Sequence, residues 1–311
     1  MNSYEALRSD AAAIDLSARG KIRVTGEDRA RLLHAMSTNH VNGLKEGEGV
    51  YSFFLTAQGR ILADAYIYNL EDSFYLDTEP ELGTKLLEHL DRYIIADDAE
   101  VHDETANWAV IGLEGPRSLE RAASLGIPVP ANEFGSSKWN SGFAARVAST
   151  GPQGIRIFVP VAELSALMQT LTDAGIPQAS AKDARVVRLE NGIPRYGEDI
   201  TERYLVQETG ILQAVHFSKG CYLGQEIVER VRSRAQVHRH LKSLRISAST
   251  APEPGTKLTL DGQNIAELTS AAYSPALGEV VALGYVRTEG TIGSSQFVVA
   301  GSDPAIAARL G

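Results

Sequence analysis

Hydrophobic periodicity changes near residue 240 and divides the chain into two parts of different character. Before this point, segments with the spacing of helices alternate with segments that have the pattern of strands. After it, helical spacing disappears, and short strand-like runs are separated by turns such as Glu253-Pro-Gly255. The sequence therefore predicts an α+β region over residues 1–240 and a small all-β domain, a barrel, over residues 241–311.

The α+β region contains two similar patterns, and its strands are expected to be mainly antiparallel. The first begins with a strand at residues 21–24 and a helix, and continues with a meander of strands over residues 50–78 and a further helix. The second has strands at residues 108–113 and 155–159 and a helix over residues 162–174. A chain of 311 residues is too long for one ordinary core. We therefore expect two subdomains before the barrel.

The composition excludes several classes of protein. The net charge of −9 argues against a protein that binds nucleic acid by neutralising phosphates over its whole surface. Cys221 is the only cysteine, so neither an intramolecular disulfide nor a zinc site with two cysteine pairs can form, and a lone thiol fits the reducing cytoplasm. There is no signal-peptide core. No uninterrupted apolar run approaches the roughly 20 residues of a membrane span, so no membrane association is expected.

Several common catalytic and phosphate-binding motifs are absent. The chain has no glycine-rich loop with Walker or Rossmann spacing, no Gly-x-Ser-x-Gly elbow and no His-Glu-x-x-His pair. The seven histidines are scattered, and only His238 and His240 are close together. The sequence predicts no metal site. A cysteine–histidine active centre would require the fold to bring His216, His238 or His240 to Cys221.

Two glycines flank the only cysteine in the segment Lys219-Gly-Cys-Tyr-Leu-Gly-Gln-Glu226. Glycines allow positive φ angles and a close approach of the backbone to a ligand. A helix is expected to begin near Gly224, and its N-terminus together with Lys219 would favour the thiolate of Cys221. The segment indicates a reactive or ligand-contacting cysteine. The alternative is a buried cysteine that acts as a small apolar residue.

A carboxylate stands in the last turn of a predicted helix, in Arg188-Leu-Glu-Asn-Gly-Ile-Pro-Arg-Tyr-Gly197. An acid is unfavourable at this end of a helix dipole, and such a locally poor choice often marks function. The Glu190 carboxylate could accept two parallel hydrogen bonds from a planar, amidine-like edge such as that of a pterin. The alternative is a structural ion pair with Arg188 or Arg195.

Positive charge is concentrated over residues 230–245. This stretch contains Arg230, Arg232, Arg234, Arg239, Lys242 and Arg245, together with His238 and His240. In an acidic chain this asymmetry could serve an anion, such as a polyglutamate tail or an RNA phosphate. The alternative is a solvated surface whose long side chains cover apolar groups.

Four segments resemble known families. Lys219–Glu226 is similar to the signature of the YgfZ family, which includes related mitochondrial iron–sulfur assembly factors. Residues 188–197 resemble a segment shared by that family and the glycine-cleavage T-protein. Thr38-Asn39 and Leu55-Thr-Ala-Gln-Gly-Arg-Ile-Leu-Ala-Asp64 resemble the same superfamily. The resemblance covers nearly the whole chain and is weakest over residues 110–180.

The resemblance implies a T-protein-like folate-binding fold, with ferredoxin-like subdomains and a C-terminal β-barrel. The implied cofactor is tetrahydrofolate or a one-carbon derivative of it. Cys221 and Lys219 would be the groups that act, in a loop facing the folate cavity, and Glu190 would hold the pterin edge. The other residues implied to contact folate are Asp64, Asn39, Tyr51, Tyr196, Gly220, Tyr222, Gly224, Gln225 and Glu226.

The implied role is support for the assembly or repair of iron–sulfur enzymes, including those that modify tRNA, rather than turnover of a substrate. The T-protein has two adjacent aspartates after its Gly-Gly turn, and the first is catalytic. Ala63 aligns with the first and Asp64 with the second, which argues against aminomethyl transfer. A folate-dependent aminomethyl- or methyltransferase is the alternative, since a shift of one residue would align Asp64 with the catalytic aspartate. A third interpretation is a module that contacts tRNA through residues 230–245.

Overall fold

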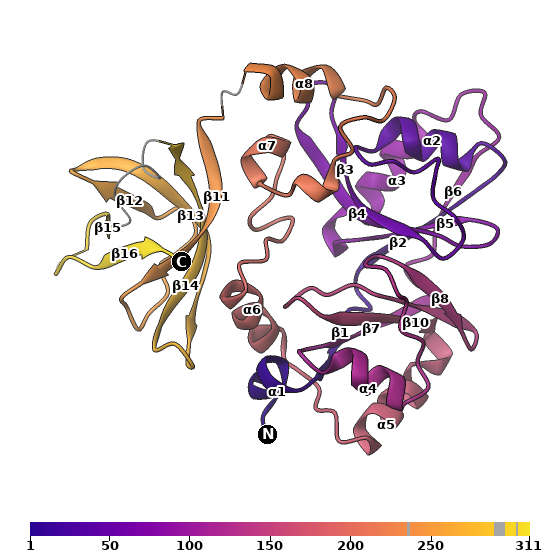
Figure 1. Cartoon of the computed structure of the whole chain (residues 1–311), viewed down its shortest axis with the longest axis horizontal. Coiled ribbons are helices and arrows are strands. Elements are labelled where there is room, and N and C mark those ends of the chain that lie inside the picture. Colours follow the sequence, from indigo (N-terminus) through magenta and orange to yellow (C-terminus); the bar gives the residue numbers. More distant parts are fainter. Residues whose placement is uncertain (235–236, 289–295, 303) are drawn as a thin grey trace.

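The computed structural model describes residues 1–234, 237–288, 296–302 and 304–311. Two α+β subdomains lie one above the other, and a β-barrel stands beside both (Figure 1). None of the helices in these ranges has the length and apolar character of a membrane span. The expected α+β region followed by a β-barrel is confirmed. Parts of the expected barrel domain and of the basic stretch 230–245 lie outside the described residues.

The first subdomain is an antiparallel sheet with strand order β3-β4-β5-β2-β6. Its strands are β2 (Gly20–Thr25), β3 (Gly49–Leu55), β4 (Ile61–Asn69), β5 (Phe74–Thr78) and β6 (Glu100–Asp103). Helices α2 (Arg29–Met36) and α3 (Gly83–Asp91) contribute Leu33 and Leu86 to its core. The meander expected over residues 50–78 is β3, β4 and β5.

The second subdomain repeats this arrangement, with strand order β1-β7-β10-β9-β8. Its strands are β1 (Ala12–Asp15), β7 (Trp108–Glu114), β8 (Ser136–Trp139), β9 (Gly142–Ala145) and β10 (Gly154–Pro160), and its helices are α4 (Ser118–Ser124) and α5 (Leu164–Asp173). Strand β1 precedes the whole first subdomain in the chain, yet it pairs with β7. The two subdomains are therefore interleaved in sequence, which the periodicity did not reveal.

Helices α1 (Ser3–Ser9) and α6 (Ala181–Glu190) lie between the second subdomain and the barrel (Figure 1). Helix α6 begins where the Ser180 side chain accepts a hydrogen bond from the backbone N–H of Asp183. The other helical segments are α7 (Val206–Thr209), α8 (Gln225–Arg234) and the 3-10 turns η1 (Pro80–Leu82), η2 (Val161–Glu163) and η3 (Leu212–Ala214).

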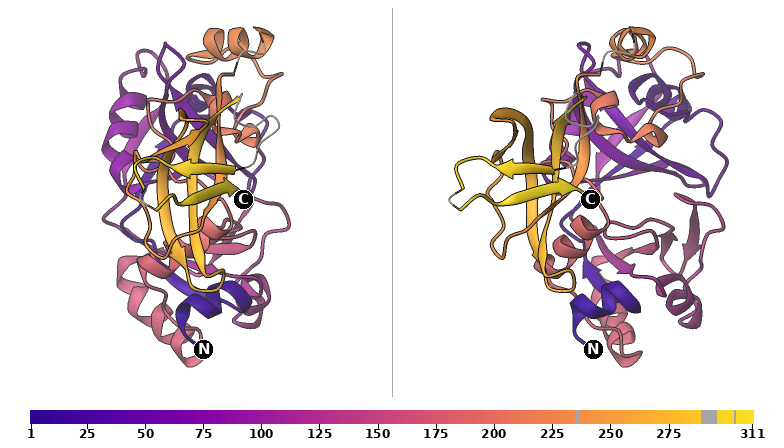
Figure 2. Two further views of the ribbon diagram at one scale, coloured as in Figure 1. Left: turned by 90° about the vertical axis from the view of Figure 1, so that its left-hand side faces the viewer. Right: turned by 60° about the vertical axis from the view of Figure 1, so that its left-hand side comes forward.

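The barrel is closed and has the strand order β11-β14-β13-β12-β15-β16. The strands are β11 (Arg239–Ile246), β12 (Lys257–Leu260), β13 (Gln263–Ser274), β14 (Glu279–Arg287), β15 (Gln296–Val299) and β16 (Ala307–Leu310). Figure 2 shows the barrel covering one side of the subdomains, with α1 at one end of it. Closure removes the exposed strand edges of so small a sheet.

Candidate functional site

Side chains alternate between the two faces of β4, so Ala63 and Asp64 point in opposite directions. Ala63 is completely buried and lies in the core of the first subdomain. Asp64 points to the opposite face and lines a cavity of about 320 Å³ together with Tyr66. The carboxylate position that faces the cavity is thus the second of the aligned pair.

The cavity lies where three parts of the chain meet. Strands β3 and β4 contribute Tyr51 and Asp64, the second subdomain contributes Arg156, and α6 and the segment that follows it contribute Arg188 and Tyr196. Three of the residues that the sequence implied for folate contact, Asp64, Tyr51 and Tyr196, are therefore brought together in one cavity.

The Asp64 carboxyl is set up to exchange a proton. Tyr51 donates a hydrogen bond of 2.6 Å from its hydroxyl to Oδ2 of Asp64. Burial, followed by the neighbouring carboxylate of Glu79, raises the pKa of Asp64 to about 7, although the Tyr51 hydrogen bond acts in the opposite direction. A buried carboxyl with such a pKa can act as a general acid or base near neutral pH.

Buried ion pairs fix the cavity wall and join the two subdomains. Asp77 on β5 pairs with Arg19 and with Arg156, which comes from β10 of the second subdomain. Although burial acts to raise it, these arginines hold the pKa of Asp77 below its usual value. The guanidinium of Arg156 also lies 4.4 Å from the centroid of the Tyr66 ring. The charges of Arg19 and Arg156 beside the cavity are therefore paired with Asp77.

The irregular loop that follows α6 is held from two sides. Tyr196 donates from its hydroxyl to the carbonyl oxygen of Leu62 at 2.7 Å. The fully buried Asp199 accepts hydrogen bonds from Arg188 at 2.7 Å and from Thr269 of the barrel at 2.6 Å. The barrel thus helps to position one wall of the cavity.

Glu190 lies elsewhere. Its carboxylate accepts hydrogen bonds from Arg8 at 2.9 Å, from Ser274 at 2.6 Å and from the hydroxyl of Tyr4. These partners belong to α1 and β13, and Glu190 does not line the cavity that contains Asp64. The structural ion pair considered for Glu190 exists, but with Arg8 rather than with Arg188 or Arg195. Pterin recognition by Glu190 stays a prediction, and it would require this group of contacts to open.

A second cavity adjoins the first. It has a volume of about 430 Å³ and shares Tyr51, Tyr66, Ile193 and Pro194 with the first cavity. Asn39 does not line either cavity. Its side-chain amide donates to the carbonyl oxygens of Tyr51 at 3.0 Å and Gln213 at 2.8 Å. Asn39 therefore supports two residues that line the second cavity.

Lys219 is a clamp. Its buried ammonium donates to the carbonyl oxygens of His34 at 2.5 Å, Ser37 at 2.7 Å and Asn39 at 2.7 Å. These three bonds use all its hydrogens and join the signature loop to the end of α2. Burial lowers the pKa of Lys219 to about 7, whereas the three carbonyl oxygens favour its charged form.

The rest of the signature loop docks on the first subdomain. Gly224 has φ +83°, and a Cβ atom there would lie 2.7 Å from the carbonyl oxygen of Thr56. Tyr222 is buried, and its ring centroid lies 5.1 Å from Nζ of Lys219. Gln225 and Glu226 form the first turn of α8, while Gly220 and Cys221 are exposed.

None of residues 219–226 lines either of the two adjoining cavities. The expectation that Lys219 and Cys221 face the same cavity as Asp64 stays a prediction.

Three histidines lie close together beside this loop, a grouping that no pattern in the sequence indicated. The ring centroids of His34 and His40 are 4.9 Å apart, and those of His40 and His216 are 5.2 Å apart. Burial, followed by the charge of Lys219, lowers the pKa of His34 to about 4. In the described ranges, no group of three or more His, Cys, Asp or Glu side chains is arranged to hold a metal ion. His34 and His40 are close in the sequence, whereas only the fold brings His216 to them.

The basic stretch 230–245 is divided between α8 and β11. Arg232 pairs with Glu229 at 3.2 Å, and Arg239 pairs with Glu208 at 2.8 Å. Part of its charge is therefore neutralised within the protein.

Comparison with known proteins identifies the fold and the family. The family model for the GCVT N-terminal domain matches residues 1–219, and that for the glycine cleavage T-protein C-terminal barrel domain matches residues 239–310. The aminomethyltransferase of Rubrobacter xylanophilus is 29% identical over 294 residues, which cover 92% of this chain and 78% of that protein. The aminomethyltransferase of Streptomyces coelicolor is 32% identical over 301 residues, which cover 91% of this chain and 80% of that protein.

A solved structure has the same fold. The glycine cleavage system aminomethyltransferase T from Bartonella henselae superimposes with a TM-score of 0.90 over 99% of this chain and 87% of that one, at 22% identity. The two family models together match most of the sequence, from the first subdomain to the last strand of the barrel. This chain therefore belongs to the family of proteins that combine a GCVT N-terminal domain with a glycine cleavage T-protein C-terminal barrel domain.

Proposed function

We propose that this protein binds tetrahydrofolate, or a one-carbon derivative of it, in the two adjoining cavities beside Asp64. The observation that carries the proposal is a buried carboxyl with a pKa of about 7, hydrogen-bonded to Tyr51, in a cavity walled by tyrosines. A neutral or ionised carboxyl can match the donors and acceptors of a reduced pterin, and aromatic rings suit its flat faces. The second cavity offers room for the remainder of the ligand.

We further propose that the protein supports iron–sulfur enzymes, including those that modify tRNA, in the cytoplasm. The supporting observation is that Cys221 is exposed on a loop whose shape is fixed by Lys219 and Gly224. An exposed thiol on a rigid support suits contact with a partner protein better than a role inside the folate cavity. The likeness of residues 219–226 to the YgfZ signature points to the same role.

Aminomethyl or methyl transfer to or from folate is the second candidate. It is favoured by the position of Asp64, because the carboxyl that faces the cavity is present and only the core-facing position holds alanine. The aminomethyltransferases among the relatives agree with this candidate. A direct tRNA contact through residues 230–245 is the least supported possibility, since part of that charge is paired.

One set of variants separates these roles. Wild type, Asp64→Asn and Cys221→Ala are titrated with tetrahydrofolate by calorimetry, and each is expressed in a YgfZ-deficient bacterium while a cluster-dependent tRNA methylthiolation is measured. We expect wild type to bind folate and restore the modification, and Cys221→Ala to bind folate without restoring it. Full restoration by Cys221→Ala would contradict a role for the thiol, and absence of folate binding by wild type would overturn the cavity assignment.

The transferase candidate predicts a different pattern. Turnover of a methylamine-type donor with formation of methylene- or methyl-tetrahydrofolate should then occur with wild type and with Cys221→Ala, but not with Asp64→Asn. Correct folding of each variant is checked by its thermal unfolding midpoint.

A further inference from the structure

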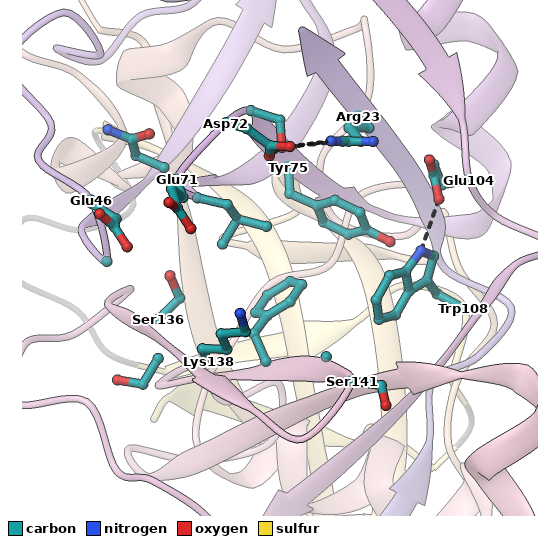
Figure 3. Close-up of a pocket in the computed structure, with 17 residues that line it drawn as sticks. Arg23, Glu46, Glu71, Asp72, Tyr75, Glu104, Trp108, Ser136, Lys138 and Ser141 are labelled. Atoms are coloured by element: carbon teal, nitrogen blue, oxygen red, sulfur yellow. Dashed lines mark hydrogen bonds and ion pairs between the residues drawn. The ribbon is translucent and has the colours of Figure 1, made fainter.

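A third cavity lies apart from the folate cavities. It has a volume of about 690 Å³ and is formed by the turn between β4 and β5, the hairpin of β8 and β9, and the start of β7 (Figure 3). It shares no residue with either cavity near Asp64. A ligand bound here would therefore not be the folate proposed above.

One wall of this cavity is aromatic. The ring centroid of Tyr75 lies 5.3 Å from that of Phe143 and 6.2 Å from that of Trp108. Trp108 is half-buried, and its indole N–H donates to Glu104 at 2.8 Å, which fixes the ring and the carboxylate relative to each other. A held tryptophan face is the strongest of the aromatic partners for a cation.

Two buried hydroxyls in the cavity wall lack partners. Tyr75 is only 2% exposed, and neither its hydroxyl nor that of Ser136 has a hydrogen-bond partner in the part of the chain that the structure describes. An unsatisfied buried hydroxyl destabilises the folded state, and phenylalanine at position 75 would avoid that loss. Figure 3 shows the Tyr75 hydroxyl directed toward Glu104 and Trp108, so a bound group near these side chains could supply the missing bond.

The charge of the cavity favours a cation. Arg23 is paired with Asp72 at 2.7 Å, so the two cancel. The carboxylates of Glu46, Glu71 and Glu104 then face a single further cation, Lys138. The uncancelled charge is negative, next to aromatic rings and unsatisfied hydroxyls.

We propose that this cavity binds a protonated organic amine with an apolar or aromatic group. The ammonium would lie between the Glu104 carboxylate, the Tyr75 hydroxyl and the face of Trp108, and the apolar group would contact Phe143. A primary or secondary amine fits better than a quaternary one, because its N–H groups can donate to the Glu104 carboxylate and to the Tyr75 hydroxyl.

Calorimetry with benzylamine and with its neutral analogue benzyl alcohol tests the proposal on the full-length protein. We expect saturable binding of benzylamine and binding of benzyl alcohol about tenfold weaker. Glu104→Gln keeps an acceptor for Trp108 but removes the charge, and it should weaken benzylamine binding about tenfold. The matched control is Glu100→Gln on β6, outside the cavity, for which we expect no change.

Tyr75→Phe tests the hydroxyl separately. Without amine, its unfolding midpoint should equal or exceed that of wild type, because no described partner is lost. With benzylamine, its affinity should be reduced about threefold or more. Saturating tetrahydrofolate should leave benzylamine binding unchanged, which keeps this site distinct from the proposed folate site. Equal affinities for benzylamine and benzyl alcohol, no saturable binding, or an unaffected Glu104→Gln variant would each overturn the proposal.

Discussion

The hydroxyl of Tyr51 on β3 donates a 2.6 Å hydrogen bond to Oδ2 of Asp64 on β4, inside the cavity between the two subdomains. The two strands are paired, so the sheet holds donor and acceptor at a fixed separation. Burial keeps the pKa of the carboxyl at about 7, and the tyrosine hydrogen bond limits this increase. The hydrogen bond therefore joins two buried side chains whose strands are held together by the sheet.

The raised pKa of Asp64 makes stability depend on pH. In an unfolded chain an aspartate has a pKa of about 3.9, against about 7 here, so the folded state binds the proton more tightly. The stabilisation that the protonated carboxyl gives the folded state is complete below about pH 3.9 and is lost as the pH rises through about 7. The free energy of unfolding of Asp64→Asn, relative to that of wild type, should therefore increase by roughly 2–4 kcal/mol between about pH 4 and about pH 8. Urea unfolding at both pH values measures this, and an equal difference at each would contradict it.

Tyr51→Phe should shift the same transition to higher pH. The substitution removes only the hydroxyl that donates to Asp64 and lowers its pKa. The free energy of unfolding of Tyr51→Phe is compared with that of the Tyr51→Phe, Asp64→Asn double variant as the pH rises. The pH at which this difference changes should be higher than the pH at which the difference between wild type and Asp64→Asn changes. Tyr66→Phe is the control, because Tyr66 also lines the cavity but has no side-chain hydrogen bond to Asp64. A shift toward lower pH in Tyr51→Phe would refute the assignment.

Lys219→Met tests whether the Lys219 amine has a structural role or takes part in chemistry. The variant keeps the length of the side chain but leaves three carbonyl oxygens without their donor. We expect a loss of about 2–4 kcal/mol in the free energy of unfolding. The exposed Lys242 on β11 provides the control, and Lys242→Met should change stability by less than about 0.5 kcal/mol. Wild-type stability of Lys219→Met, together with lost function, would instead indicate that the amine takes part in chemistry.

The direction of the Asp64 side chain could have been predicted from the sequence, whereas the contacts of Glu190 could not. Strands were expected over residues 50–78, and the alternation of side chains along a strand already separates Ala63 from Asp64. Alignment of the paired aspartates ignored this alternation. By contrast, Glu190 contacts Tyr4 and Ser274, which are 186 and 84 residues away in the chain. No local pattern reports such contacts, because they depend on how the barrel and α1 pack on α6.

Asp77→Asn should destabilise the protein strongly. The substitution leaves Arg19 and Arg156 buried with one charge partner removed, which typically costs about 3–5 kcal/mol. The control is Asp72→Asn, which breaks the exposed pair with Arg23 and should cost less than about 1 kcal/mol. Urea unfolding near pH 7 compares them, and similar losses in the two variants would argue against the buried network as the connection between the subdomains.

Gly224→Ala tests how tightly the signature loop docks on β3. The position has φ +83°, and the new methyl group would lie 2.7 Å from the carbonyl oxygen of Thr56 and 2.9 Å from Cβ of Leu55. Gly278 is a matched control, since its φ is +67° but nothing lies within 4 Å of an added Cβ atom. Gly278→Ala should cost only the backbone strain of about 1 kcal/mol, and Gly224→Ala about 3 kcal/mol, because backbone must also move. The modification of Cys221 by a thiol reagent should become faster in Gly224→Ala alone, as the loop that carries Cys221 loses its support. Equal stability losses and unchanged thiol reactivity would mean that the glycines serve only the backbone conformation, and that the exposed thiol does not depend on this docking.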